Sequence, residues 1–353
     1  MLPDPAFWAG RRVLLTGHTG FKGAWLALWL RQLGAQVTGL SLPPPTDPSL
    51  FVLAGVAGDV DHRLGDVREA AAVEAALAAC QPQVVLHLAA QALVRPSYAD
   101  PVMTFATNVM GTVHVLDAIR RCASVQAVVV VTSDKCYDNR EWPWGYREPE
   151  PMGGRDPYSA SKGCAELVTA AMRQSFCETG PWIASARAGN VFGGGDWAQD
   201  RLVPDLVQAF LRGQPAAVRR PAAVRPWQHV LEPLAGYLLL AERLVVQGAA
   251  YAQAFNFGPT AQSERPVLHV AQLLQQVWPG AQLDVAAVQD GPHEAGLLRL
   301  DASLARARLG WRPRLGLGEA LAWTAQWYRQ FAGDRHGMRE VTLDQIRRYQ
   351  ALA

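Results

Sequence analysis

A glycine-rich loop between an apolar run and a helical pattern constrains the fold of this chain more than any other stretch. Residues 13–15 are apolar, the loop after them carries Gly17, Gly20 and Gly23, and residues 24–30 have a helical pattern. A strand, a glycine-rich turn and a helix in this order are the context of a dinucleotide pyrophosphate site. The first glycine permits the tight turn, the second lets the backbone approach phosphate oxygens, and the third allows close helix–strand packing. Free N–H groups at the start of the helix then face the anion.

The composition argues against several classes of protein. The 353 residues suffice for one large domain or two small ones, and 50% hydrophobic with 18% charged residues is typical of soluble globular chains. A net charge of +2 gives no reason to expect nucleic acid or an anionic membrane as a partner. Residues 1–12 lack the apolar segment of a secretory signal, and no apolar run is long enough to cross a membrane.

The cysteines indicate a reducing compartment. There are five of them, with no C-x-x-C pair and no His/Cys cluster at zinc spacing. We therefore expect reduced thiols in a cytoplasmic protein and no bound metal.

Apolar runs alternate with helical patterns through the first half of the chain. This alternation predicts a doubly wound parallel sheet with right-handed crossovers, which is a Rossmann-type α/β fold. The expected strands after the first are residues 36–40, 61–64, 84–88, 128–132 and 182–187, and the expected helices are 69–79, 101–121 and 158–177.

The alternation stops near Gly189. Glycine, proline and arginine interrupt residues 212–227, whereas residues 228–241 have a helical pattern and 254–258 read as a strand that returns to the main sheet. We therefore expect two domains that are interleaved along the chain. They are a dinucleotide-binding domain of residues 1–187 plus about 228–258, and a smaller mixed α/β lobe of about 188–227 plus 259–353, which closes over a substrate cleft.

Tyr158 and Lys162 are a candidate catalytic pair. Residues four apart share one face of a helix. A phenol with a pKa near 10 is a poor base at neutral pH, but a neighbouring cation and an oxidised nicotinamide both favour the phenolate. Such a base can take the proton of a sugar hydroxyl while hydride leaves the same carbon. The spacing also occurs on ordinary surface helices, and the hydroxyls of Thr132 and Ser133 one strand earlier favour the catalytic interpretation.

A second acid/base couple follows the fifth strand. Ser133, Asp134, Lys135 and Tyr137 lie directly after it, and open α/β sheets bind ligands at the carboxyl ends of their strands. A strand-end ion pair between Asp134 and Lys135 is the alternative interpretation.

The glycine-rich loop and the Tyr158–Lys162 pattern together resemble the extended short-chain dehydrogenase/reductase superfamily. They read TGHTGFKG at 16–23 and YSASK at 158–162. Four longer strings are similar to the CDP-glucose 4,6-dehydratases of its nucleotide-sugar branch, and the likeness covers about residues 6–350. These strings are SDKCY at 133–137, MGGRDPY at 152–158, GNVFGGGDW at 189–197 and RPWQHVLEPL at 225–234.

The resemblance implies a reaction on CDP-glucose with bound NAD. C4 of the hexose is oxidised, water is eliminated across C5 and C6, and the hydride returns to C6. By the family pattern Ser133 binds the reacting sugar oxygen, Asp134 protonates the departing hydroxyl and Lys135 takes the C5 proton, while Tyr137 forms a wall of the cleft. Many related dehydratases carry Glu at position 135, so this lysine acts as a base only with a lowered pKa, and Asp134 needs a raised one.

The expected NAD contacts come from the motif and the resemblance together. Ser41 and Leu42 follow the second strand, where such folds usually carry an acidic residue for the ribose, so the sequence itself does not choose between NAD and NADP. The expected residues are Thr16, Gly17, Thr19, Gly20, Phe21, Lys22, Gly23, Ser41, Asp66, Val67, Ala89, Ala90, Gln91, Asn108 (ribose or structural), Thr132, Tyr158 and Lys162. His18 and Phe21 are expected to be packing residues within the loop.

The resemblance also places the sugar nucleotide. Arg225 suits bidentate phosphate binding because a planar guanidinium matches two oxygens at once, although a surface arginine is the alternative. The other expected contacts are Asn190 at the diphosphate, Leu202, Val203 and Pro204 at the base, and His293 and Glu294 near the diphosphate.

Several alternatives remain open from the sequence. A nucleotide-sugar 4-epimerase would need Tyr158 and Lys162 but not Asp134 and Lys135, and a dehydratase of another nucleotide sugar would share all four. A non-catalytic NAD-binding protein would typically lack the tyrosine or the lysine. The Trp-rich loop 142–146 suits either a mobile cover or a rigid packed loop. The apolar helices 101–121 and 158–177 predict a homodimer with a four-helix interface, or a tetramer built from it.

Overall fold

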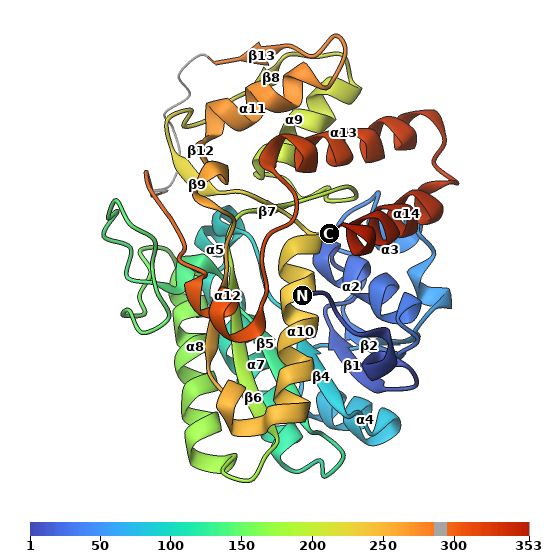
Figure 1. The fold of residues 1–353 in the computed structure, drawn as a ribbon, viewed down its shortest axis with the longest axis vertical. Helices are drawn as coiled ribbons and strands as arrows, with labels where there is room; N and C mark the ends of the chain where they lie inside the picture. The colour runs from blue at the N-terminus through green and yellow to red at the C-terminus, as the bar shows by residue number, and fades with distance from the viewer. Residues whose placement is uncertain (286–294, 353) are drawn as a thin grey trace.

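The computed structural model describes residues 1–285 and 295–352, and its centre is a seven-stranded parallel sheet with the order β11-β6-β5-β4-β1-β2-β3. The chain starts at β1, proceeds to β3 and then crosses back past β1 to β4, which confirms the doubly wound pattern (Figure 1). The strands are β1 Arg12–Thr16, β2 Gln36–Ser41, β3 Asp61–Leu64, β4 Val84–His87, β5 Ala127–Val131, β6 Trp182–Ala188 and β11 Ala254–Phe257.

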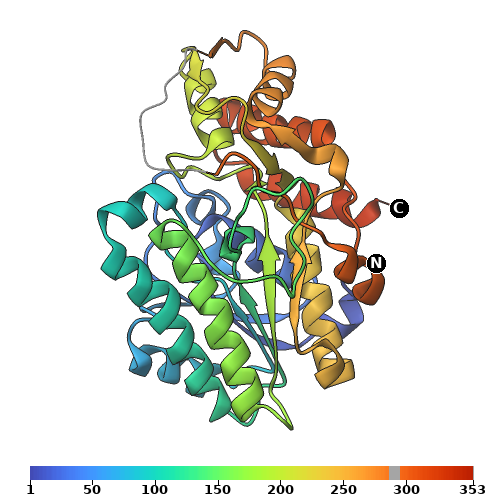
Figure 2. The same cartoon turned by 90° about the vertical axis from the view of Figure 1, so that its left-hand side faces the viewer.

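Helices cover both faces of the sheet because neighbouring side chains along a strand point to opposite faces. Leu14 of β1 and Val85 of β4 pack with one set of helices, whereas Val13 and Leu86 of the same strands pack with the other. Figure 2 shows α7 and α8 side by side on the first face. The first set includes α4 Ala70–Cys80, α7 Gly111–Arg120 and α8 Pro157–Phe176, and the second includes α2 Phe21–Gln32 and α10 Leu231–Gln247.

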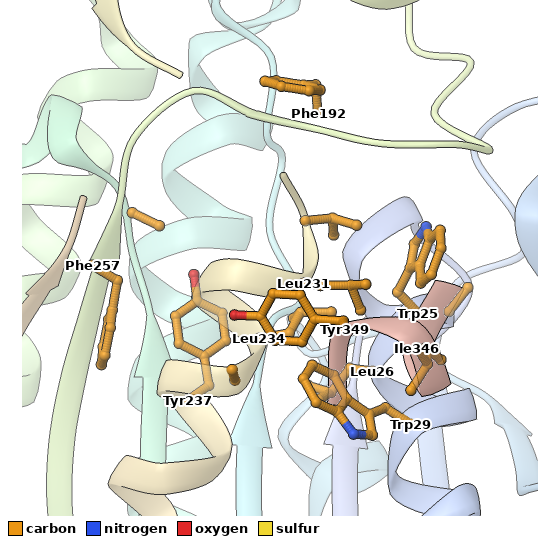
Figure 3. Close-up of a cluster of buried hydrophobic side chains, with 14 of the residues drawn as sticks. Trp25, Leu26, Trp29, Phe192, Leu231, Leu234, Tyr237, Phe257, Ile346 and Tyr349 are labelled. Atoms are coloured by element: carbon orange, nitrogen blue, oxygen red, sulfur yellow. The ribbon is translucent and has the colours of Figure 1, made fainter. Parts of the chain in front are cut away.

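The C-terminal helix α14 (Met338–Ala351) closes the second face. Trp25 and Trp29 of α2 pack with Tyr237 of α10 and Tyr349 of α14 in one cluster (Figure 3). The ring centroids of Trp29 and Tyr349 are 5.7 Å apart in an edge-on arrangement. Each large apolar side chain buried in this way contributes roughly 1.5–3 kcal/mol. The C-terminus therefore holds α2, the helix that carries the glycine-rich loop, in place.

Several elements from the second half of the chain form a smaller lobe at the carboxyl ends of the strands (Figures 1 and 2). Its helices pack around a continuation of the main core rather than a separate one. The lobe includes α9 Leu202–Leu211, α11 Val267–Gln276, α13 Leu317–Gly333 and the short strands β8 Ala216–Ala217, β9 Val224–Pro226, β12 Glu264–Pro266 and β13 Leu283–Asp284.

The expected helix over 228–241 is wrong at its first residues. Gln228–His229 form β10, which pairs in parallel with β7 (Val191–Phe192). Hydrogen bonds from Gln228 N to Asn190 O (3.0 Å) and from Val230 N to Phe192 O (2.8 Å) hold the chain extended there. The helix α10 starts at Leu231 instead, because this pairing with a distant strand outweighs the local helical pattern.

The expected helix over 101–121 is present but contains a wide turn. It consists of α6 (Pro101–Phe105), the π-helical segment η2 (Ala106–Met110) and α7. Single π turns occur often at functional sites. By length and composition Pro101–Arg120 could span a membrane, yet it packs against α4 and α8 as an ordinary layer of the fold.

Candidate active site

The glycine-rich loop has the geometry that its sequence predicts. Gly17 adopts a φ of +78°, and a Cβ there would lie 2.8 Å from the backbone N of Ala89. A Cβ on Gly23 would lie 2.1 Å from the carbonyl oxygen of Gly17. Gly20 is the N-cap of α2 and has no side chain to occupy the free N–H groups at the start of that helix. The loop therefore leaves a side-chain-free cradle that fits a dinucleotide pyrophosphate.

Several of the expected cofactor residues hold this cradle in shape. The hydroxyl of Thr16 accepts hydrogen bonds from Leu88 N (3.2 Å) and Ala89 N (3.1 Å), which ties the end of β1 to the end of β4. Asn108, in the π turn, accepts from Gln91 N (2.8 Å) and donates to Gln91 O and to Ser161 Oγ. Of the two roles expected for Asn108, its geometry fits the structural one, because its amide is committed to these bonds.

One side of the loop, where adenosine is expected, is built from β2 and β3. Thr19 Oγ1 shares a 2.7 Å hydrogen bond with Ser41 Oγ and donates to Leu42 O at 2.9 Å. Asp66, just after β3, is held by Arg68, whose hydrogen bond lowers the pKa of that carboxyl. His18 packs at the loop as expected, with its ring 5.5 Å from that of Phe51. Val67 is buried in the core of the first face, Phe21 packs against the core of the second, and Ala89 and Ala90 follow β4.

A cavity of about 220 Å³ brings the expected catalytic and substrate residues together. Ser133, Asp134 and Lys135 enter it from the end of β5, and Tyr158 enters from α8. The Nζ of Lys135 lies 5.9 Å from the centroid of the Tyr158 ring. Tyr158 therefore shares one chamber with Asp134 and Lys135. The expected substrate residues in its wall are Asn190, Leu202, Val203, Pro204 and Arg225.

Tyr158 is held as a phenol by its surroundings in the chamber. Burial raises the pKa of Tyr158 to about 12, although a hydrogen bond with Ser133 and the charge of Arg201 oppose the rise. Lys162 lies behind the chamber, where its Nζ donates to Val131 O at 3.3 Å, and burial lowers the pKa of Lys162 to about 8. A further positive charge in the chamber is therefore needed before Tyr158 can act as a base.

Asp134 has the properties of a proton donor. Burial raises the pKa of Asp134, although the charges of Lys135, Arg225 and Lys22 and a hydrogen bond from Ser133 oppose the rise. Ser133 Oγ donates to Asp134 Oδ1 at 3.0 Å. The other oxygen, Oδ2, is buried and has no hydrogen-bond partner within residues 1–285 and 295–352. An orphaned carboxyl oxygen of this kind is available to a substrate hydroxyl.

The lobe holds Arg225 beside Asp134. Its guanidinium donates to Val224 O at 2.9 Å and to Ala295 O, and it lines both the main cavity and a smaller one next to it. Arg225 is thus a buried arginine of the chamber and not the surface residue that the sequence left open. His293 and Glu294, the last two expected substrate residues, lie outside the described residues.

Further cationic side chains line the chamber, among them Lys22, Arg201 and Arg219. Lys22, which the sequence placed only at the cofactor, reaches it from the glycine-rich loop, and burial and the charges of Arg201 and Lys162 lower the pKa of Lys22 to about 7. The sequence did not single out the two arginines. Arg201 is fixed by buried Asp196 at 2.9 Å, and at the mouth Arg219 bridges Asp200 (2.6 Å) and Asp205 (2.8 Å). Neither belongs to a motif, so no signal in the sequence marked them.

Part of the Trp-rich loop packs through stacked rings. Trp142 stacks on Tyr146 with centroids 5.4 Å apart, and Tyr146 stacks on Tyr137 at 5.1 Å. The backbone of Tyr146 pairs with Arg299 and Asp301. Of the two cavities described here, Tyr137 lines the smaller one, and its hydroxyl donates to Asn256 Oδ1 at 2.7 Å.

Comparison with known proteins agrees with this geometry. The profile of the family described as GDP-mannose 4,6 dehydratase matches residues 14–324. The chain belongs to this family. It is 49% identical over 335 residues to the CDP-glucose 4,6-dehydratase of Salmonella typhimurium, with 92% of each chain covered. It is also 28% identical to the dTDP-glucose 4,6-dehydratase of Xanthomonas campestris pv. campestris, over 89% of this chain and 92% of that one.

Solved structures share the fold of this dehydratase family member over almost its whole length. The UDP-glucose 4-epimerase of Thermus thermophilus, in complex with NAD, superposes with a TM-score of 0.77 at 25% identity and covers 90% of this chain and 99% of that one. DesIV, a dTDP-glucose 4,6-dehydratase from Streptomyces venezuelae with NAD bound, superposes with a TM-score of 0.76 at 24% identity, over 91% and 98%. The scaffold is therefore common to dehydratases and epimerases, and the residues of the chamber must distinguish the two.

Proposed function

We propose that this protein is an NAD-dependent CDP-glucose 4,6-dehydratase, a hydro-lyase that forms CDP-4-keto-6-deoxyglucose and water. One observation supports dehydration over epimerisation: Asp134 and Lys135 enter the same cavity as Tyr158. An epimerase has no use for an acid and a base there. The 49% identity to the Salmonella typhimurium enzyme supports CDP-glucose as the substrate.

The residues of the chamber have distinct tasks in this reaction. When bound, NAD would supply the hydride chemistry between C4 and C6 of the hexose. Gly17, Gly20 and Gly23 would hold its pyrophosphate against the start of α2. Tyr158 takes the proton from the C4 hydroxyl, and Ser133 orients that oxygen. Lys135 removes the C5 proton, which the C4 ketone has made acidic.

Asp134 completes the elimination. It carries a proton because burial raises the pKa of its carboxyl, and it delivers that proton to the departing C6 hydroxyl. The diphosphate is bound by Asn190 and Arg225, and the base packs on Leu202, Val203 and Pro204. We place the NAD contacts in residues 1–187 plus about 228–258 and the sugar-nucleotide contacts in about 188–227 plus 259–353.

Incubation of the purified protein with CDP-glucose, UDP-glucose and dTDP-glucose in parallel tests the proposal. We expect a 4-keto-6-deoxy sugar, detected by its ultraviolet absorbance in alkali, from CDP-glucose first and fastest. A galactose epimer without this product would identify an epimerase. Faster turnover of UDP- or dTDP-glucose would overturn the nucleotide assignment.

We propose further that the protein is a cytoplasmic homodimer, or a tetramer built from such dimers. Exposed apolar side chains on the α6–α7 and α8 layer support this interface: Val102 is 78% exposed and Leu167 60%, and Phe105, Met110 and Phe176 are exposed nearby in the sequence. Val102→Asp should convert the dimer to a monomer in sedimentation velocity. Migration of the unaltered protein as a 38.4 kDa species would refute the interface.

A further inference from the structure

A buried carboxylate lies directly behind the reaction chamber. Glu166 is on α8, four residues beyond Lys162 and eight beyond Tyr158, so all three share one helix face. Its side chain is 4% exposed. Oε1 accepts from Thr132 Oγ1 at 2.5 Å, while Oε2 accepts from Ser185 Oγ and from Arg187 Nη2, both at 2.7 Å. Both oxygens are therefore occupied by residues of the sheet.

The same ion pair reaches both ends of the segment that carries Asp134 and Lys135. Thr132, bound by Glu166, lies at the start of this segment. Arg187 Nη1 donates to Tyr137 Oη at 2.7 Å, at its far end, and to Glu148 O at 3.0 Å. Residues 132–137 are thus held at two points by one carboxylate and one guanidinium.

Stability alone does not account for such an arrangement. Taking two charges out of water costs free energy that their attraction often only just offsets, and apolar residues of similar volume can serve a fold equally well. The ion pair joins α8 to β6, and the hydrogen bond from Thr132 to Glu166 joins α8 to the end of β5, so these bonds fix the relative position of the two catalytic elements, β5 and α8.

We infer that Glu166 is a positioning residue of the proposed reaction: it fixes residues 132–137 through Thr132 and Arg187, and it is the negative charge that Lys162 faces. This inference rests on the proposed function. Glu166 touches neither substrate nor cofactor in this assignment and acts only through its neighbours.

The charges around Lys162 support a role for Glu166 in keeping Lys162 protonated. Lys162 is faced by Glu166 and Cys136, which favour the ammonium, while burial disfavours it. Its other charged or titratable neighbours are Lys22 and His87. Around Glu166 lie Arg187 and Arg173. Although burial raises the pKa of Glu166, the Arg187 ion pair and the hydrogen bonds outweigh it, so the carboxylate stays ionised.

Glu166→Gln keeps the shape of the side chain and removes the charge. Because Lys162 then loses its proton more readily, we expect the alkaline limb of the kcat profile to move down by about one pH unit. Amide exchange of residues 132–137, measured without substrate, should become roughly tenfold faster. Glu166→Asp keeps the charge but shortens the side chain. It should lower kcat without moving the alkaline limb of the kcat profile.

Glu232→Gln is the matched control. Glu232 is another buried carboxyl, bound by Tyr349 Oη (2.6 Å) and by the backbone N of Leu315 (2.7 Å), away from the chamber on α10. Like Glu166→Gln, Glu232→Gln should lower Tm. It should leave the alkaline limb of the kcat profile and the amide exchange of residues 132–137 unchanged. If Glu166→Gln behaves like Glu232→Gln, its role is merely structural and the inference is wrong.

Failure of the proposed function gives a different result. An unaltered protein that dehydrates no nucleotide sugar would refute the function, and the exchange measurement would still decide the positioning of residues 132–137. Should Glu166→Gln fail to fold, Thr132→Val removes one of the same hydrogen bonds without burying a new charge. It should accelerate exchange at the start of the segment, and unchanged exchange would contradict the inference.

Discussion

Two buried carboxyls lie on opposite sides of the end of β5, and they are used in opposite ways. Glu166, behind the strand, has both oxygens bound and a pKa below its usual value because Arg187 pairs with it. Asp134, in front, has one oxygen without a partner in the described chain and a pKa raised by burial. Glu166 is satisfied and holds position, whereas Asp134 keeps one buried oxygen that a ligand can bind.

Replacing Tyr158 tests the front of the strand most strongly. Tyr158→Phe removes the proposed base of the first step, and we expect turnover to fall about 10³-fold, because a positioned base contributes roughly 10²–10⁴-fold. NAD affinity, measured by calorimetry, should change little. Tyr251→Phe, whose hydroxyl bonds only Arg308 O at 3.0 Å among the described contacts, is the control. Residual activity within a few-fold of normal would exclude Tyr158 as the base.

Asp134→Asn separates the two halves of the reaction. The amide cannot deliver a proton to the C6 hydroxyl, so product formation should fall about 10²–10³-fold. Oxidation at C4 does not need this group, and the absorbance of reduced nicotinamide should still rise in a single turnover. Asp138 forms an exposed ion pair with Arg140 just beyond Tyr137. Asp138→Asn should leave product formation and the nicotinamide signal unchanged. Loss of the nicotinamide signal together with product would contradict the assignment.

Lys22 tests whether an unpaired cation in front of the strand binds phosphate. Its ammonium has no hydrogen-bond or ion-pair partner in the part of the chain that the structure describes. Lys22→Met should raise KM for CDP-glucose and Kd for NAD about tenfold with little change in kcat. The pKa of Lys22 is about 7, so binding should weaken as the pH rises above 7. Lys22→Arg should remove that dependence, and unchanged affinities in Lys22→Met would refute the role.

Glu242 shows that a raised pKa alone does not identify a reacting group. Burial raises the pKa of Glu242 to about 7, yet its Oε1 accepts from Asp4 N (2.9 Å) and Trp8 Nε1 (2.7 Å), and it lines neither of the two cavities described above. A carboxyl with a raised pKa stabilises the fold fully below its unfolded value of 4.5, and this contribution is lost as the pH rises through 7.

Glu242→Gln should therefore flatten the pH dependence of stability between pH 4.5 and 7 by about 1–2 kcal/mol, after allowance for its partial exposure. Denaturant titrations of both proteins across that range measure the effect. Turnover should be unchanged. An altered turnover would show that the contacts of the N-terminal segment affect the chamber.

Much of the front of the strand could be predicted from sequence, because its residues are contiguous. Parallel strands buried on both faces read as apolar runs, and the loop at Gly17 and the couple at Tyr158 and Lys162 have fixed spacings. The buried ion pair behind the end of β5 could not be predicted in the same way. Glu166 and Arg187 are single residues on different elements, and their pairing depends on how α8 lies on the sheet.

The predictions from local sequence pattern that failed have the same cause, which is contact between elements far apart in the sequence. Gln228 and His229 are extended because β7, more than thirty residues earlier, offers them hydrogen-bond partners. The role of Lys22 in the chamber depends on the lobe that places Arg201 and Asp196 next to it, which no property of the loop encodes. Sequence patterns therefore identified which residues lie at the strand ends, and packing decided which of them were left unpaired.

The wide turn at Ala106–Met110 couples two properties that would otherwise be independent. It places Asn108 against the loop after β4, and it also sets the rotational phase between α6 and α7. Deleting a single residue from the turn would rotate α6 by about 100° relative to α7. Val102 and Phe105 would then turn away from the outer surface, and Asn108 would at the same time lose its hydrogen bonds with Gln91. An insertion or deletion at this point would therefore damage the proposed subunit interface and the glycine-rich cradle in one event.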